Sequence, residues 1–410
     1  FYGNSDWTDT PSPLLSRPEI AGSLPMPVIP TLESHMYVTD TTEGRHLVAN
    51  PYFHQVDPTG QQLPYISEQD EVYKNDNEVR LLSIVNGDVD YKAQSLQLAS
   101  APALLDGQAQ GNYTVDLRPE ITLGVFSFNV THEDEAKRNV FGDIRFREAM
   151  SIAINRAELN DVGFFGEGTP QQYIGFSPKP AFVSDKWLSH ATDFDAARAN
   201  SLLDAMGMKD TDGDGFRELP NGDKLVLNLS FATQGIGGPT VELVGQYWAD
   251  VGVQSIVKEV TPDEFRSAQS ANKLDVMMWR KSQPLAIVLG NNELWVPPFE
   301  NYFGVRTGML WAEWVDSNGA NGVEPPSYVK ELISDINLFQ SADQSSDDFK
   351  VLGERLVKNM VENLLFIGTV NAPAPMIHHN NLKNFTSFKT HSYEYYRTYP
   401  YRATQWWLNE

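Results

Sequence analysis

The sequence predicts an α/β protein in which helices pack on a sheet, and four patterns along the chain support this fold class. The run "ITLGVFSFNV" (121–130) is apolar, β-branched and aromatic, as expected of a strand buried on both faces. "PTVELVGQYWADVGV" (239–253) has apolar residues at helical spacing, and the strand patterns "VQSIVKEV" (253–260) and "KLDVMMW" (273–279) follow it. Alternation of helices and strands is typical of a sheet with helical cover.

The first third of the chain contains a turn and a helix. Residues 1–35 are rich in Pro, Ser and Thr and predict an irregular surface stretch. "NPYFHQVDPTGQQLPYI" (50–66) places Asp-Pro-Thr-Gly between aromatic segments, which predicts a hairpin-like turn. "NEVRLLSIVNGDVDY" (77–91) predicts a helix that ends at Asn86-Gly87, followed by the short strand "DVDY".

Two further helices are expected in the middle of the chain. "DIRFREAMSIAINRAELNDV" (143–162) has Asp143 as its expected N-cap. One face of this helix is predicted to hold Phe146, Ala149, Met150, Ala153 and Ala157. In 239–253 the apolar stripe is Val241, Val244, Trp248 and Val251, and Gly252 is expected to end the helix.

The stretch "DTDGDGFRELPNGD" (210–223) begins like a calcium-binding loop. Asp210, Asp212 and Asp214 occupy loop positions one, three and five, but position twelve is Asn221 where an EF-hand requires glutamate. A helical pattern precedes the stretch, and apolar residues at period two follow it. The unit is therefore predicted as helix, acidic turn and strand.

Two interpretations of this turn stay open. Asp and Gly are common in tight turns because they hydrogen-bond locally to the backbone and tolerate left-handed conformations. The three aspartates could instead hold an incidental calcium ion, with Glu218 or Asp223 completing the ligand set. No other cofactor is expected.

Composition excludes several function classes. The chain has 54 acidic and 31 basic residues, a net charge of −23, which disfavours binding to nucleic acid or to anionic lipid. Cysteine is absent, which excludes thiol catalysis, disulfides and cysteine metal sites. No apolar run approaches the roughly 20 residues needed to cross a bilayer. Since the chain starts at Phe1, we expect any signal peptide to have been removed already.

No enzyme motif is present in the sequence. It contains no GxSxG elbow, no P-loop, no GxGxxG after a strand, and no HExxH among its eight histidines. The chain is therefore predicted not to be an enzyme. A glycan-acting hydrolase with paired carboxylates and tryptophan platforms stays open as the alternative.

Five segments, in this order, resemble the family 5 extracellular solute-binding proteins of ABC importers. They are "NPYFHQVDPTGQQLPYI" with "RLLSIVNGDVDY", "FSFNVTHEDEAKRNVFGDIRFREAMSIAINRAEL", "FDAARANSLLDAMGMKDTDGDGFREL", "GQYWADVGVQSIVKEVTPDEF" and "LDVMMW". The resemblance implies capture of an oligopeptide first, or an oligosaccharide next, and delivery to a membrane permease. It also implies a periplasmic or extracellular location.

The resemblance further implies two lobes joined by hinge strands. Lobe I would comprise 1–128 and 376–410, and lobe II 129–375, with crossings near Phe126–Asn129 and Phe366–Ala372. Family members carry a substantial segment before the "NPYF" region, whereas about fifty residues precede it here. We therefore expect part of lobe I to be missing from the chain or to be a separate polypeptide.

The expected ligand contacts are mostly aromatic. Trp279 is the first candidate because it is expected to end its strand, and ligands of α/β sheets lie beyond strand carboxyl ends. Arg280 could bind a ligand carboxylate or form a surface ion pair. Phe128 and Asn129 lie at the expected hinge, where Asn129 could bond ligand or fix the crossing. Further candidates, in a stretch expected to be irregular, are Trp295, Trp311 and Trp314. For each tryptophan, packing in the core is the alternative.

Overall fold

The computed structural model describes residues 31–74, 76–93, 96–119, 123–232, 235–300, 304–387 and 402–409. Most of the predicted irregular stretch 1–35 lies outside these residues. The chain divides into two compact units, and the boundaries fall at Arg118–Pro119 and Ala374–Pro375. The first of these boundaries lies about ten residues before residue 128, which the sequence analysis gives as the end of the first segment of lobe I.

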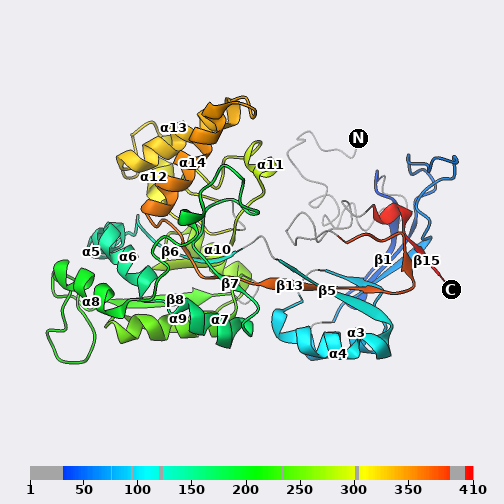
Figure 1. Cartoon of the computed structure of the whole chain (residues 1–410), viewed down its shortest axis with the longest axis horizontal. Helices are drawn as coiled ribbons and strands as arrows, with labels where there is room; N and C mark the ends of the chain where they lie inside the picture. The colour runs from blue at the N-terminus through cyan, green and yellow to red at the C-terminus, as the bar shows by residue number, and fades with distance from the viewer. Residues whose placement is uncertain are drawn as a thin grey trace, which may run out of the picture. The chain divides into compact units, whose positions relative to one another are not determined.

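Among its described residues, the first unit contains two three-stranded sheets, the two-stranded sheet β14-β15 and two α-helices. An antiparallel meander has the order β1-β2-β3, and a second sheet has the order β4-β13-β5. The strands of this unit are β1 (His35–Asp40), β2 (Gly44–Ala49), β3 (Glu68–Val72), β4 (Tyr91–Lys92), β5 (Tyr113–Pro119), β13 (Pro373–His379), β14 (Leu382–Lys383) and β15 (Trp407–Leu408). Its helices are α3 (Asn77–Val85) and α4 (Ala101–Gly111), which lie side by side (Figure 1), with short 3₁₀ turns η2 (Leu98–Ser100) and η4 (Ala403–Gln405).

Helix α3 and the preceding turn form as the sequence predicts. Asp76 caps α3 by accepting hydrogen bonds from Glu78 and Val79, and the chain leaves the helix through Gly87 at φ +84°. The position of the predicted strand "DVDY" (88–91) is wrong, because β4 begins only at Tyr91. The turn at Asp57 is closed by hydrogen bonds from the Thr59 and Gln61 amides to its carboxylate.

The described residues of the second unit form three small sheets. An antiparallel sheet has the order β10-β6-β11, β8 and β9 pair in parallel, and β12 pairs with β7. The strands are β6 (Leu123–Phe128), β7 (Thr169–Pro170), β8 (Val226–Phe231), β9 (Gln254–Glu259), β10 (Val276–Lys281), β11 (Ile367–Gly368) and β12 (Val370–Asn371). Because β6 pairs with β10 on one side and β11 on the other, it is the central strand of its sheet.

Alternate residues of β6 and β10 enter two different hydrophobic cores. One core receives Val125, Met277 and Trp279, and the opposite core receives Phe126, Phe128, Val276 and Met278. This is the two-residue period of a strand buried on both faces. The prediction of a buried strand in 121–130 is thereby confirmed for the strand Leu123–Phe128, and residues 121 and 122 lie outside the described residues.

Helices pack on both sides of these strands. They are α5 (Glu135–Gly142), α6 (Ile144–Ile152), α7 (Arg156–Phe164), α8 (Ala196–Ala205), α9 (Gly238–Asp250), α10 (Pro262–Ser270), α11 (Leu285–Val288), α12 (Met309–Asp316), α13 (Ser327–Ser341) and α14 (Asp347–Glu362), with the 3₁₀ helix η3 (Asp185–Trp187). Figure 1 shows α12, α13 and α14 gathered at one end of the unit, and α7, α8 and α9 beside β8 at the other. Among the described residues, no helix combines the length and apolarity needed to cross a bilayer.

One helix prediction is wrong. The stretch 143–162 forms two helices, because Asn155 leaves the helical conformation and caps α7 by accepting a hydrogen bond from the Glu158 amide. Asp143 caps α6 as predicted, and the first four residues of the predicted face are buried. Ala157 lies beyond the break and is exposed.

Helix α9 agrees with its prediction throughout. The stripe of Val241, Val244, Trp248 and Val251 is buried, with at most 1% of each residue exposed. Gly252 has φ +80°, a left-handed conformation that glycine adopts without steric cost, and it turns the chain into β9.

Candidate functional site

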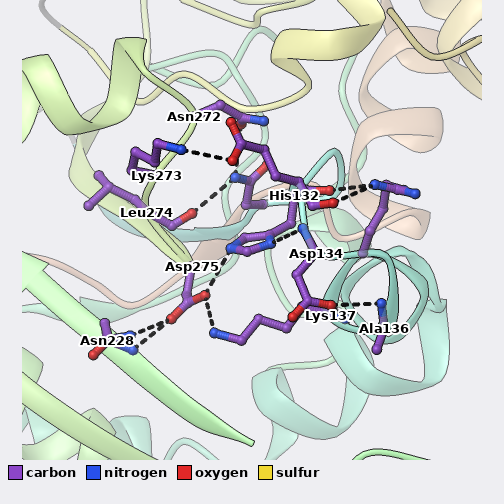
Figure 2. A network of polar contacts seen from close by, with 12 residues as sticks. His132, Asp134, Ala136, Lys137, Asn228, Asn272, Lys273, Leu274 and Asp275 are labelled. Carbon is purple, nitrogen blue, oxygen red and sulfur yellow. Dashed lines mark hydrogen bonds and ion pairs between the residues drawn. The ribbon is translucent and has the colours of Figure 1, made fainter. Parts of the chain in front are cut away.

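A buried carboxylate, Asp275, joins three elements of the second unit at the entrance to β10 (Figure 2). Its Oδ1 lies 2.8 Å from Nζ of Lys137 on α5 and 3.2 Å from Nε2 of His132. Its Oδ2 accepts hydrogen bonds from the backbone amide and the side-chain amide of Asn228 on β8, at 2.9 and 3.0 Å. Asp275 is 2% exposed, so these contacts replace water around the charge.

The histidine in this network has a defined tautomer. The backbone N–H of Asp134 donates to Nδ1 of His132 at 2.9 Å, so that nitrogen is an acceptor. Nε2 of His132 therefore carries the ring proton and donates to Asp275. The ring thus connects the cap of α5 to the start of β10.

The network controls the acidity of Asp275. Burial by itself would raise the pKa of this carboxyl group, but hydrogen bonds from His132, Lys137 and the Asn228 amide outweigh it and lower the pKa to about 2. Asp275 is therefore ionised at neutral pH. The sequence analysis did not single out these residues, because a lone aspartate before a strand gives no motif and its partners come from distant segments.

Asn129 lies at the end of β6 and is fully buried. Its side-chain amide donates to Oδ1 of Asn272 at 2.9 Å and to the Leu274 carbonyl at 3.0 Å, and its carbonyl oxygen accepts from the Thr131 amide at 3.2 Å. These bonds tie the end of β6 to the segment before β10. Both roles predicted for Asn129, a hydrogen bond to ligand and fixing of the crossing, stay predictions.

Trp279 lies in the middle of β10, not at its end. The strand continues to Lys281, and Trp279 pairs with Val125 of β6, so the predicted strand end is wrong. The indole is 8% exposed and packs against Phe265, with ring centroids 5.4 Å apart. A Cβ atom on Gly235 would overlap the indole, so the backbone approaches it closely. The core interpretation of Trp279 accounts for all these contacts.

The neighbouring Arg280 has its backbone in β10, where it pairs with Gly124. Its side chain lies outside the described part of the structure, and its predicted role stays a prediction. Phe128, the other predicted residue of the crossing, is 1% exposed and packs edge-on against Phe146, with ring centroids 5.0 Å apart.

The tryptophans of the predicted irregular stretch occupy different surroundings. Trp311 and Trp314 lie on helix α12, so the expectation of irregular structure is wrong for them. Trp311 is 5% exposed and contacts Tyr328 edge-on, whereas Lys330 lies over the Trp314 ring, its Nζ 5.2 Å from the centroid. Both side chains therefore have contacts within the second unit.

Trp295 differs from the other candidates because it keeps an unused hydrogen-bond donor. It is fully buried against Phe176, yet its Nε1 has no hydrogen-bond partner in the described structure. The hydroxyl of Tyr173 in the same core is likewise without a partner. Burial, and after it the charge of Glu300, raises the pKa of this Tyr173 hydroxyl, which therefore stays protonated and able to donate. Buried donors without partners are rare in folded proteins.

The acidic turn brings four of its five carboxylates together. One oxygen each from Asp210, Asp212, Asp214 and Glu218 lie within 4.8 Å of one another. Backbone amides already bond the three aspartates: Gly213 and Gly215 donate to Asp210, Asp214 to Asp212, and Phe216 to Asp214. The buried Glu218 accepts from the amide and hydroxyl of Thr211 at 2.8 Å.

A lysine supplies positive charge to this turn. Nζ of Lys224 lies 2.8 Å from Oδ2 of Asp212 and 2.6 Å from Oδ2 of Asp214. The hydrogen bond from Lys224 lowers the pKa of Asp214, and its bonds to both carboxylates raise the pKa of Lys224. The donor set has the oxygen chemistry that calcium prefers, but local donors satisfy it in this geometry. Calcium binding by the turn stays a prediction.

The comparisons with known proteins identify relatives by sequence. The family model described as bacterial extracellular solute-binding proteins, family 5 (middle), matches residues 37–285. The periplasmic alpha-galactoside-binding protein of Rhizobium meliloti (strain 1021) is 25% identical over 356 residues, which are 82% of this chain and 49% of the relative. A probable ABC transporter-binding protein of Deinococcus radiodurans is 27% identical over 191 residues, 45% of this chain and 31% of that protein. The chain thus spans about half or less of the length of these curated relatives.

Solved structures agree with the fold. The oligopeptide-binding protein OppA is 29% identical with a TM-score of 0.65, and the match covers 94% of this chain and 63% of OppA. The periplasmic binding protein MelB of Agrobacterium fabrum C58, solved with stachyose, is 20% identical with a TM-score of 0.74, covering 93% and 57% of the two chains. These matches confirm the predicted α/β periplasmic-binding-protein architecture. Because the family model matches more than half of the sequence, the chain belongs to the bacterial extracellular solute-binding proteins of family 5.

Proposed function

We propose that the chain is part of the solute-binding component of an ABC importer, which captures a small oligomeric solute and delivers it to a membrane permease. The observation that carries this proposal is the family match over residues 37–285. The relatives are named as binding proteins, which supports solute capture without chemical conversion. Their names also support a periplasmic or extracellular location.

Two solute classes have support. An oligosaccharide is supported by the curated relative named for alpha-galactosides, which aligns with 82% of the chain, and by the fold match to a stachyose complex. An oligopeptide is supported by the 29% identity to OppA. Sugars and peptides both offer hydroxyl or carbonyl acceptors to buried protein donors.

Within the second unit, the unused donors of Trp295 and Tyr173 are the proposed contacts for such acceptors. The aromatic faces beside them would supply apolar contact, as in most small-molecule sites. Trp279, Arg280, Asn129, Phe128 and Trp311 remain proposals as ligand contacts.

Titration calorimetry with stachyose and with a mixed-sequence nonapeptide tests the proposal. We expect saturable binding of one class, with the other inert and with no release of reducing ends or shorter peptides over a day. Steady product release would overturn the binding-protein proposal and favour the hydrolase alternative. Failure of both probes to bind, in a chain shown to be folded by circular dichroism, would count against solute capture by this chain.

The variant Trp295→Phe tests the site. Phenylalanine keeps most of the apolar packing and removes the donor, so affinity should fall by about tenfold, the loss expected for one buried hydrogen bond to ligand. Trp407→Phe, at an exposed indole that is not a candidate contact, is the matched control and should leave affinity within about twofold. Equal losses in both variants would remove Trp295 from the proposed site.

A further inference from the structure

A surface pocket of about 390 Å³ lies between helix α14 and the 3₁₀ helix η3. Its floor consists of Phe182, Trp187 and Val351. Its rim holds the basic residues Lys186, Lys350, Arg355 and Lys358, together with Glu354. On α14 these residues occupy positions 350, 351, 354, 355 and 358, which is the spacing of one helix face. We call this feature the α14–η3 pocket.

The single carboxylate in the pocket lining is already used by the fold. Oε1 of Glu354 accepts a hydrogen bond from Nε1 of Trp187 at 2.8 Å, and Oε2 accepts from the Ser184 amide at 2.9 Å. Glu354 therefore holds η3 against α14. Both donors are neutral, so Glu354 keeps its negative charge and offsets one of the four cations of the rim.

The basic rim is partly unneutralised. Arg355 pairs with Asp335, and Lys350 pairs with the exposed Asp347 at 2.8 Å. Lys186 lies over the Trp187 ring, its Nζ 4.4 Å from the centroid, and neither Lys186 nor Lys358 has a carboxylate partner in the described part of the chain. In a chain of net charge −23, a cluster of four cations beside an apolar floor is unexpected.

One residue of the apolar floor is open to solvent, whereas Trp187 is 5% exposed and Phe182 is half-buried. Val351 is 61% exposed although Phe349 and Leu356 of the same helix are buried. Exposed apolar surface ringed by charge is a feature of protein contact sites, where one anchor residue fills a pocket and polar residues surround it.

We propose that the α14–η3 pocket docks an acidic segment of a partner protein, which inserts one apolar side chain between Trp187 and Val351. Carboxylates flanking that side chain would pair with Lys186 and Lys358. The volume suits one large side chain, and the open rim would leave a free small molecule less enclosed than ligand sites normally require.

The net charge of the chain favours an acidic segment over two other occupants, an anionic bilayer and a second copy of the chain. An anionic bilayer and a second copy of the chain both present extended negative surfaces, which a chain of charge −23 repels over a Debye length of about 8–10 Å. A short acidic segment interacts mainly with the four basic residues of the pocket rim. The inference does not depend on solute capture, because it concerns residues outside the proposed ligand contacts.

Fluorescence anisotropy with a labelled pentapeptide tests the inference. The peptide carries a central phenylalanine with two acidic residues on each side. We expect saturable binding to the whole chain at low salt, weakened about tenfold or more in the double variant Lys186→Glu/Lys358→Glu. The double variant Lys258→Glu/Lys383→Glu changes the net charge equally at solvent-accessible sites outside the pocket and should bind within about twofold of the parent chain. Binding of stachyose or nonapeptide should be the same in all three proteins.

Several results would overturn the inference. They are absence of peptide binding, equal weakening in both double variants, or equal binding of a peptide whose central residue is serine. Co-sedimentation with phosphatidylglycerol vesicles that is lost only in Lys186→Glu/Lys358→Glu would assign the pocket to lipid instead. Self-association lost only in that variant, measured by analytical ultracentrifugation, would assign it to a second copy.

Discussion

At the scale of single residues, Trp279 and Trp295 behave differently although both are buried tryptophans. The indole of Trp279 is packed against Phe265 and lies close to the Gly235 backbone. Trp295 is also enclosed, but its donor is unused. From the sequence, Trp279 is predicted to lie in a strand and Trp295 in an irregular stretch. The sequence could not distinguish them, because hydrogen-bond satisfaction depends on atoms from distant segments.

Trp279→Ala should lower the free energy of unfolding by about 3–5 kcal/mol, because it empties a core aromatic site. Urea unfolding followed by circular dichroism measures this loss. Trp407→Ala, at an indole that is 44% exposed, is the control and should cost less than about 1 kcal/mol. A Trp279→Ala chain of unchanged stability but weakened solute binding would instead make Trp279 a ligand contact.

The acidic turn yields a prediction about calcium. Chelation with EDTA should change the melting temperature of the parent chain little, because backbone amides and Lys224 already satisfy the carboxylates. In Lys224→Met the ammonium is lost, so the unpaired carboxylates should bind calcium and the melting temperature should rise on its addition. Differential scanning fluorimetry with calcium and with magnesium measures both effects.

A large fall in the melting temperature of the parent chain with EDTA, restored by calcium, would contradict this account of the turn. Lys258→Met removes an exposed lysine from β9 and serves as the control, with no calcium response expected.

At the scale of elements, the Asp275 network joins the segment before α5 to β8 and β10. In the folded chain the pKa of Asp275 is about 2, below its ordinary value of 3.8. A carboxyl group with a depressed folded pKa contributes stability above its unfolded pKa, and this contribution is lost as the pH falls from about 4 towards 2. The network therefore stabilises the fold at neutral pH and less so in acid.

Asp275→Asn should cost about 3 kcal/mol at pH 7, because Lys137 loses its buried counter-charge. The difference from the parent chain should shrink as the pH approaches 3, where the parent loses the same stabilisation. Urea unfolding at several pH values measures the loss of stability at pH 7 and its decrease towards pH 3. Asp263→Asn, at a 90% exposed side chain, is the matched control. A pH-independent difference would show that Asp275 acts through shape and not charge.

Elements with a strong local pattern could be predicted from sequence, and breaks between them could not. Helix α9 has four buried residues at helical spacing and a glycine at its end, all of which are local signals. The break at Asn155 was missed because apolar residues continue past it at helical spacing, whereas the capping bond that creates it is a single contact. The polar network of Asp275 was missed for a different reason: its members are 138 and 47 residues apart.

At the scale of the whole chain, net charge should govern the response to salt. The 54 acidic residues exceed the 31 basic ones, so repulsion remains after ion pairs have formed. Raising NaCl from about 10 to 150 mM shortens the Debye length from roughly 30 to 8 Å, and the melting temperature should rise. The more acidic double variant Lys258→Glu/Lys383→Glu should show a steeper rise. A falling melting temperature would mean that attractive surface pairs dominate.

Strand β6 lies between the two cores of the second unit, and this has a kinetic consequence. Its side chains enter both cores, its backbone pairs with β10 and β11, and Ser127 donates a further hydrogen bond to the Leu365 carbonyl at 2.7 Å. Neither core can open without exposing one face of this strand. The amide protons of 124–128 should therefore exchange with solvent deuterium among the slowest in the chain, and only when both cores unfold together.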